Sequence, residues 1–115
     1  MAARAYRDFL ALVPKVVQRE KFMREKETER ALVNAVRRMG GICPKFVSPG
    51  FDGMPDRLVL LPTGKIGFVE VKAPGKKPRL LQLSRHKLLR KLGFKVFVLN
   101  DTGQIGGIIS EIQSA

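Results

Sequence analysis

Apolar residues recur every three to four positions in three separate parts of the chain, a spacing that places them on one side of a helix. The first part spans about residues 24–39 and ends at Gly40-Gly41, a common way for a helix to stop. The second spans about 79–92 and ends at Gly93, and the third carries four isoleucines between residues 105 and 112. The pattern therefore predicts three helices.

Short apolar runs between these helices are typical of strands. Four such runs occur: ICPKFV (42–47), DRLVLL (56–61), KIGFVEVK (65–72) and FKVFVL (94–99). Because proline cannot donate to a sheet ladder, Pro44 favours an edge position or an irregular start for the first run. We therefore expect an α/β domain with the order αβββαβα, in which helices flank a central mixed sheet of about four strands.

Residues 1–22 form a separate segment before these elements. Their apolar side chains follow helical spacing, and Pro14 would interrupt or bend such a helix. We expect a basic N-terminal appendage over 1–22, which could be helical, and a single domain over 23–115. No apolar stretch approaches the roughly 20 residues of a membrane span. The single cysteine, Cys43, excludes an intrachain disulfide, so a cytoplasmic protein is the simplest expectation.

The hairpin over residues 56–72 brings two acids together. If Pro62-Thr63-Gly64 is a three-residue loop with its glycine at positive φ, the register places Asp56 directly opposite Glu70. Directly opposed residues of an antiparallel pair lie on one face, with Cβ atoms about 4.5–5.5 Å apart.

A two-residue loop would instead place Asp56 opposite Val71. We prefer the three-residue loop because it gives the face of the two acids an apolar continuation that a helix can cover. The residues of that continuation are Leu58, Leu60, Ile66 and Phe68.

Two opposed carboxylates repel each other, and a divalent cation removes the conflict. Mg²⁺ typically takes one or two carboxylates and leaves its other positions to water and phosphate. Asp56 and Glu70 fit this description, and the Val71 carbonyl could supply a third oxygen. Lys72 returns to the face of Glu70, where its ammonium could orient a water or stabilise charge on a phosphate. The alternative is structural: Asp56 caps a turn, while Glu70 and Lys72 form a solvated pair.

The charge balance points to a polyanionic partner. Twenty-two Lys and Arg residues against ten Asp and Glu residues give a formal charge of +12. Residues 71–100 hold nine of the basic residues and no acid, so ion pairing with a phosphate backbone is expected beside the acids. The expected nucleic-acid contacts are Lys45, Lys76, Lys77, Arg79 and Arg85.

These motifs resemble the PD-(D/E)xK nuclease superfamily and, within it, the VRR-NUC (virus-type replication and repair nuclease) family. The resembling stretches, between about residues 27 and 100, are TERALVNAVRRMGG, KFVSPGFDGMPDRLVLLP, FVEVKAPGKKPRLLQ and LGFKVFVLN. The resemblance implies a restriction-endonuclease-like αβββαβ(α) core. It also implies that Asp56 and Glu70 bind metal with the Val71 carbonyl and that Lys72 is the catalytic lysine.

Two further residues carry a role by the same resemblance. Glu29 resembles the acid that the family places on its first helix, where it assists metal binding, often through water. Glu27 is a rival for that role, and a first-turn acid favoured by the helix dipole is the structural alternative. Gln82 resembles the glutamine that helps to place the lysine or the water, and a plain surface glutamine is its alternative.

Small stand-alone viral and bacterial members of the family imply a homodimer that cuts branched DNA, such as four-way (Holliday) junctions, with Mg²⁺ or Mn²⁺. A bacterial or phage-infected cytoplasm would be its location. The last helix or the N-terminal segment could form the dimer interface. Three alternatives remain open: a non-catalytic nucleic-acid-binding module, a nuclease for flaps or other structures, and a restriction-type enzyme.

Other chemistries find little support in the sequence. His86, the single histidine, lies between Arg85 and Lys87, which favours a place on a helix surface over a role as a base. With one Cys and one His, a structural zinc site is not expected. The glycines near the C-terminus do not follow a strand in a dinucleotide-binding arrangement, so no nucleotide cofactor is expected.

Overall fold

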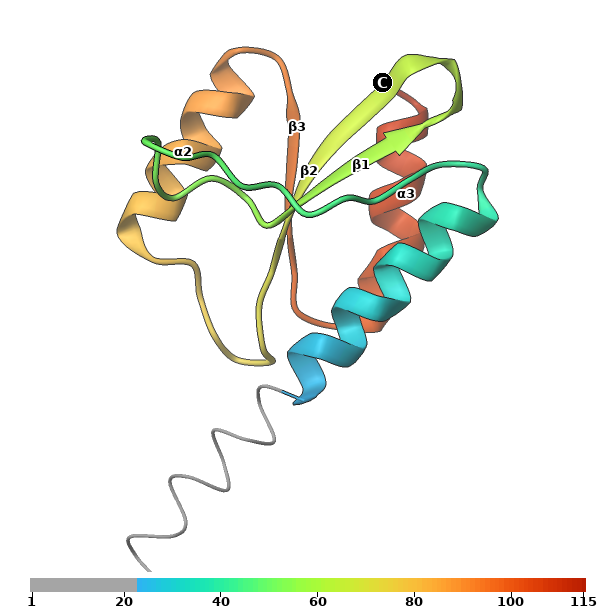
Figure 1. Cartoon of the computed structure of the whole chain (residues 1–115), viewed down its shortest axis with the longest axis horizontal. Coiled ribbons are helices and arrows are strands. Elements are labelled where there is room, and N and C mark those ends of the chain that lie inside the picture. The colour runs from blue at the N-terminus through green and yellow to red at the C-terminus, as the bar shows by residue number, and fades with distance from the viewer. Residues whose placement is uncertain (1–22) are drawn as a thin grey trace, which may run out of the picture.

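The computed structural model describes residues 23–115 and shows a sheet flanked by helices (Figure 1). The expectations for residues 1–22 lie outside the described residues. A first helix is described over residues 23–38. The elements that follow are β1 (Arg57–Leu61), η1 (Pro62–Gly64), β2 (Lys65–Val71), α2 (Leu80–Lys91), β3 (Lys95–Leu99), η2 (Thr102–Gln104) and α3 (Ile105–Gln113).

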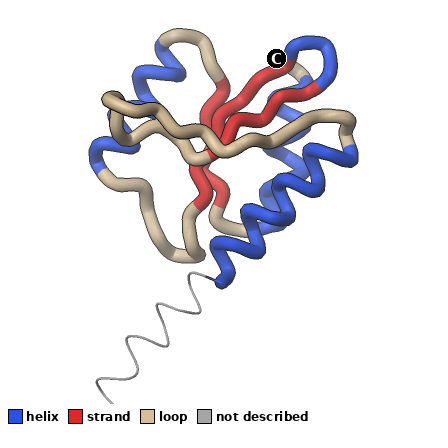
Figure 2. Tube along the Cα trace, in the orientation of Figure 1, coloured by secondary structure: helices blue, strands red, loops and turns tan. Residues whose placement is uncertain are grey.

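The sheet has the order β1-β2-β3, with β1 antiparallel and β3 parallel to β2. Helix α2 covers one face, and the first helix and α3 cover the other (Figures 1 and 2). The mixed α/β architecture and its flanking helices are confirmed. None of the described helices is long and apolar enough to cross a membrane.

The expectation of about four strands was wrong, because the described chain forms three. Residues 42–47 run antiparallel to β1 but make only isolated bridges, Ile42 with Leu60 and Lys45 with Arg57. Between these bridges the Leu58 amide donates to the Pro44 carbonyl at 3.1 Å. Pro44 has no N–H to return a bond, so the ladder is interrupted there.

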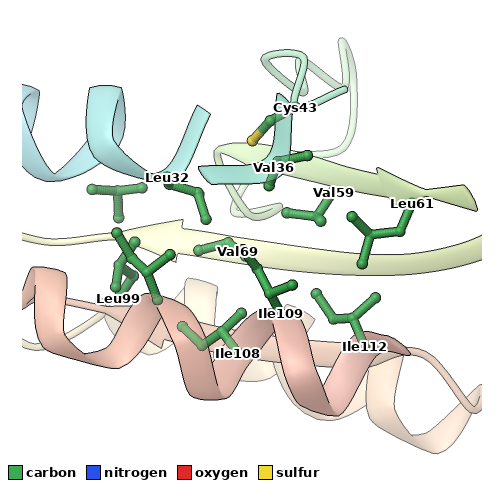
Figure 3. Packing of buried hydrophobic residues seen from close by; sticks show 12 residues of the cluster. Leu32, Val36, Cys43, Val59, Leu61, Val69, Leu99, Ile108, Ile109 and Ile112 are labelled. Atoms are coloured by element: carbon green, nitrogen blue, oxygen red, sulfur yellow. The ribbon is translucent and has the colours of Figure 1, made fainter. Parts of the chain in front are cut away.

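The larger core cluster lies between the sheet, the first helix and α3 (Figure 3). Leu32 and Val36 of the first helix meet Val59 of β1, and all three side chains are fully buried. A Cβ on Gly67 of β2 would lie 2.5 Å from Cδ1 of Ile112, so only glycine allows α3 to pack this close to the sheet. The four isoleucines of α3 are buried and therefore belong to this core.

A smaller cluster joins α2 to the other face of the sheet. Phe68, Leu89 and Val96 are buried there, and Leu58 packs against them. Phe68 also makes an edge-to-face contact with Phe94, at 5.7 Å between ring centroids. The face that continues from the two acids is thus covered by a helix, as the hairpin pattern predicted.

The hairpin has the predicted register. Leu61 pairs with Lys65, and the ladder runs outward to Arg57 opposite Val69. Gly64 has φ 75°, as the three-residue loop requires. Thr63 also has a positive φ, 66°, which the sequence did not reveal because few threonines adopt this conformation.

Candidate active site

Register and burial bring the carboxyl groups of Asp56 and Glu70 together. Asp56 directly precedes β1, and continuing the ladder by one pair places it across from Glu70 of β2. Asp56 Oδ2 accepts a hydrogen bond from the Val71 amide at 3.0 Å, which fixes its orientation. Burial, followed by the hydrogen bond and the charge of Asp56, raises the pKa of Glu70 to about 8.

Lys72 is the cation that contacts Glu70. Its Nζ lies 3.6 Å from Glu70 Oε2, and its side chain is 17% exposed, compared with 1% for Glu70. The ammonium therefore borders solvent while it touches a buried carboxyl group. Its charge lowers the pKa of Glu70 but does not outweigh burial and Asp56.

Gln82 connects the start of α2 to the acid pair. Its Oε1 accepts from the Arg79 amide at 2.9 Å, and its Nε2 donates to Glu70 Oε2 at 3.1 Å. Because the oxygen side of the amide is engaged by a backbone N–H, the nitrogen side must face Glu70. Gln82 is buried, so the alternative of a plain surface glutamine was wrong.

His86 is fully buried against Glu70, and its expected place on the helix surface was wrong. Its Nε2 lies 3.5 Å from Glu70 Oε1, which is long for a hydrogen bond. Burial first, and then the charges of Arg90 and Lys72, lower the pKa of His86, which favours a neutral ring. The spacing to Gln82 and Leu89, four and three residues away on the same helix, was the signal that the sequence offered.

The acids of the first helix divide between two environments. Glu29 Oε1 pairs with Arg57 Nε at 2.8 Å, and Arg57 Nη1 also donates to the Cys43 carbonyl at 2.9 Å. Glu25 instead interacts with Asp56: burial, followed by the charge of Asp56, raises the pKa of Glu25. Glu27 is exposed.

The charge of Asp56 therefore acts on Glu25, whereas the family resemblance had singled out Glu29. The side chains of Glu25 and Glu29 are one helical turn apart, and E-x-x-L alone does not say which turn faces the acid pair.

The loop between β2 and α2 places basic side chains beside the acids. Lys76, Lys77 and Arg79 are exposed there. The charge of Lys76 is among those that lower the pKa of Glu25, so this loop lies near the N-terminal end of the first helix (Figure 1).

Arg85 and Lys45 have different surroundings. Arg85 Nε donates to the Asp52 carbonyl at 2.8 Å, and its guanidinium lies 3.8 Å from the centroid of the Phe51 ring. Arg85 thus anchors the loop before β1 to α2. Lys45 is exposed, and its backbone forms an isolated β-bridge with Arg57 at the outer edge of the sheet.

The donor set suits a hard divalent cation. Glu70 Oε1 is buried and has no hydrogen-bond partner, while the neighbouring Asp56 carboxyl group repels its negative form. Within residues 23–115 no group of three or more His, Cys, Asp and Glu side chains is arranged to hold a metal. Mg²⁺ needs only one or two carboxylates, so Asp56 and Glu70 would be enough.

Comparisons with known proteins give a consistent picture. No family model matches the chain. The chain is 51% identical over 92 residues to "Putative nuclease p44" of Acyrthosiphon pisum secondary endosymbiont phage 1, a match that covers 80% of this chain and 98% of the relative. A solved structure described as a VRR_NUC domain has a TM-score of 0.71 and 35% identity, covering 76% of this chain and 95% of that one. The chain therefore belongs to the VRR-NUC family of nucleases.

Proposed function

We propose that the chain is a structure-selective DNA endonuclease that uses Mg²⁺ or Mn²⁺ and resolves four-way (Holliday) junctions as a homodimer. The observation that carries the catalytic part is the buried Glu70 carboxyl group, which has an unpartnered oxygen and a second carboxyl group beside it. Burying a carboxylate beside a second carboxyl group is costly unless a proton or a cation neutralises its charge.

Asp56 and Glu70 would hold the ion, with the Val71 carbonyl as a further candidate ligand. When bound there, the ion supplies Lewis acidity toward the phosphate and lowers the pKa of a water. Glu25 lies where it can assist through its interaction with Asp56. Glu29 is held by Arg57, so we propose a supporting role for it at the base of the first helix.

Lys72 and Gln82 complete the arrangement. Gln82 fixes the Glu70 carboxylate through Oε2 and keeps Oε1 of Glu70 directed away from that bond. Lys72, at the border with solvent, can stabilise negative charge on the phosphate or orient the attacking water. Lys76, Lys77 and Arg79 on the adjoining loop can hold the phosphate backbone, because exposed cations on a loop can reach it.

The homodimer follows from the need for two symmetrical cuts in a four-way junction. The four isoleucines of α3 are buried in the core, so they do not provide an exposed apolar surface for a dimer interface. Leu81, Leu88 and Leu92 are 45%, 40% and 65% exposed, and their spacing places them along one side of α2. We propose this leucine stripe as the dimer face.

Cleavage of labelled DNA tests the proposal. Four-way junction, flap and linear duplex are each incubated with Mg²⁺, with Mn²⁺ and with chelator. We expect paired cuts in the junction that need the metal and that Lys72→Ala reduces by at least ~100-fold. Lys91→Ala removes an exposed cation from the C-terminal end of α2 and is the matched control. It should cut the junction at the wild-type rate.

Binding to all three DNAs with no cutting of any would favour the non-catalytic module instead.

Light scattering of wild type and Leu88→Glu tests the dimer. We expect twice the mass of one chain for wild type and the mass of one chain for the variant, and a wild-type particle of one chain's mass would refute the homodimer.

A further inference from the structure

A basic pocket of about 430 Å³ lies between the first helix and the outer edge of β1. Five of its eight lining residues are cations, and a single one is an acid, Glu29. The cations are Lys26, Arg30, Arg37, Lys45 and Arg57. The pocket therefore carries an excess of four positive charges in a small volume, which attracts anions.

The base of this pocket is fixed. Glu29 is already neutralised by Arg57, at 2.8 Å, and both side chains are largely buried. Arg57 is held further by the Cys43 carbonyl. The acid therefore offers no free negative charge to the pocket. Arg30, Arg37 and Lys45 are exposed around this base, where a ligand can reach them.

The shape of the basic surface matches an extended anion. Lys26, Arg30 and Arg37 are four and seven residues apart, so they lie along one side of the first helix. At 1.5 Å per residue they extend over about 16 Å. One strand of B-DNA carries a charge about every 3.4 Å of helix axis, so this length corresponds to about five phosphates.

The pocket also adjoins the candidate active site. Arg57 directly follows Asp56, and alternation along the strand turns Asp56 toward α2 and Arg57 toward the first helix. Glu25 and Glu29 repeat this relationship on the helix, since Glu25 interacts with Asp56 and Glu29 with Arg57. The acid pair and the pocket therefore lie on the two sides of the same end of β1, one residue apart along the chain.

We propose that this pocket binds the DNA phosphate backbone on the first-helix side of the cleaved bond. The proposal rests on the proposed function in taking DNA as the substrate. Contacts to phosphate carry no base information, so the pocket adds affinity and register without sequence preference. Arginine suits the task because its planar guanidinium can engage two phosphate oxygens at once.

Two variants of equal charge test the proposal. The pocket variant carries Arg30→Gln, Arg37→Gln and Lys45→Gln, and the control carries Lys87→Gln, Lys91→Gln and Lys95→Gln, all at exposed positions. Binding of a fluorescein-labelled four-way junction is measured in chelator between 50 and 200 mM salt. Each lost phosphate contact reduces the slope of log K against log salt by about 0.9, so we expect a decrease of about 2–3 for the pocket variant. The control should change the slope by less than about 1.

An unchanged slope for the pocket variant would overturn the proposal, and so would an equal loss in both variants, because affinity would then follow net charge alone. The single variant Arg37→Gln gives a second measurement, with an expected slope decrease of about 0.9. Arg37→Lys should restore most of that slope. Thermal unfolding must show that all variants fold.

Competition with polyglutamate separates DNA from acidic protein as the ligand. We expect polyglutamate at equal charge to compete at least tenfold less well than DNA, and equal competition would overturn the assignment to DNA. Cleavage with Mg²⁺ keeps the two proposals distinct. Selective loss of binding without any cleavage by wild type would support the pocket and refute the nuclease, whereas cleavage with an unchanged slope would refute the pocket alone.

Discussion

Gln82 Nε2 donates to Glu70 Oε2 at 3.1 Å while Gln82 Oε1 accepts from the Arg79 amide at 2.9 Å. One side chain thus satisfies a backbone N–H at the start of α2 and orients a buried acid on β2. The helix end and the acid pair are therefore positioned by the same amide, which links local folding of α2 to the geometry of the site.

Replacing Gln82 should affect stability and metal binding together. Gln82→Ala leaves the Arg79 amide without its acceptor and Glu70 Oε2 without its donor, so we expect a loss of about 1–3 kcal/mol in unfolding free energy. We also expect Mn²⁺ to bind about 10-fold more weakly, as measured by calorimetry. Ser84→Ala, an exposed change on the same helix, is the control. Unchanged Mn²⁺ affinity in Gln82→Ala would contradict the positioning role.

The raised pKa of Glu70 predicts how stability depends on pH in metal-free protein. Folding raises this pKa from about 4.5 to about 8, so between these values the folded protein holds a proton that the unfolded chain has lost. The stabilisation is complete below about pH 4.5 and is lost as pH rises through about 8. We expect the melting temperature in chelator to fall by roughly 5 °C or more from pH 6 to pH 9.

Glu70→Gln removes the titrating group and should flatten this decrease. Saturating Mg²⁺ should also reduce it in wild type, because the cation stabilises the charged carboxylate. A decrease of equal size in Glu70→Gln would assign the pH dependence to other groups.

Glu25 and Glu29 should respond differently to the same substitution. Glu25→Gln removes an acid that interacts with Asp56, so we expect cleavage to slow about 10-fold or more with little loss of stability. Glu29→Gln leaves Arg57 partly buried without its carboxylate and should lower the unfolding free energy by about 1–3 kcal/mol. Cleavage rates and thermal unfolding measure the two effects. If Glu29→Gln instead slowed cleavage and Glu25→Gln lowered stability, Glu29 would be the acid that assists metal binding, which would contradict the assignment of Glu25.

His86 should matter through Glu70. Its ring is fully buried, and its Nε2 is 3.5 Å from Glu70 Oε1. His86→Ala should cost about 2–4 kcal/mol by leaving a cavity. His86→Phe fills the space without a ring nitrogen, so we expect partial recovery of stability but Mn²⁺ binding about 10-fold weaker than in wild type. If His86→Phe binds Mn²⁺ with wild-type affinity, His86 acts only by filling space in the core.

Much of the fold could be predicted from local pattern. Helical periodicity located the three described helices, and the loop Pro62-Thr63-Gly64 fixed the register that pairs Leu61 with Lys65. The fourth strand failed because strand existence depends on a continuous ladder, which Pro44 interrupts. An apolar run indicates that a segment is buried, but it does not show whether each backbone amide has a hydrogen-bond partner in a neighbouring strand.

The candidate site could be predicted only in part. Strand pairing placed Asp56, Glu70 and Lys72 correctly relative to one another, because two-residue alternation is rigid. The rotation of a helix about its axis is not fixed by its own sequence. His86 and Glu25 were missed for that reason: the packing of α2 and the first helix against the sheet decides which side faces the acids.

Metal binding by Asp56 and Glu70 is tested directly by a crystal of the protein grown with Mn²⁺ and measured at a wavelength with manganese anomalous signal. We expect an anomalous peak within coordination distance of carboxylate oxygens of both Asp56 and Glu70, and its loss in Glu70→Gln. Full occupancy of Mn²⁺ elsewhere, with no anomalous peak at these two carboxyl groups, would contradict a metal site formed by Asp56 and Glu70.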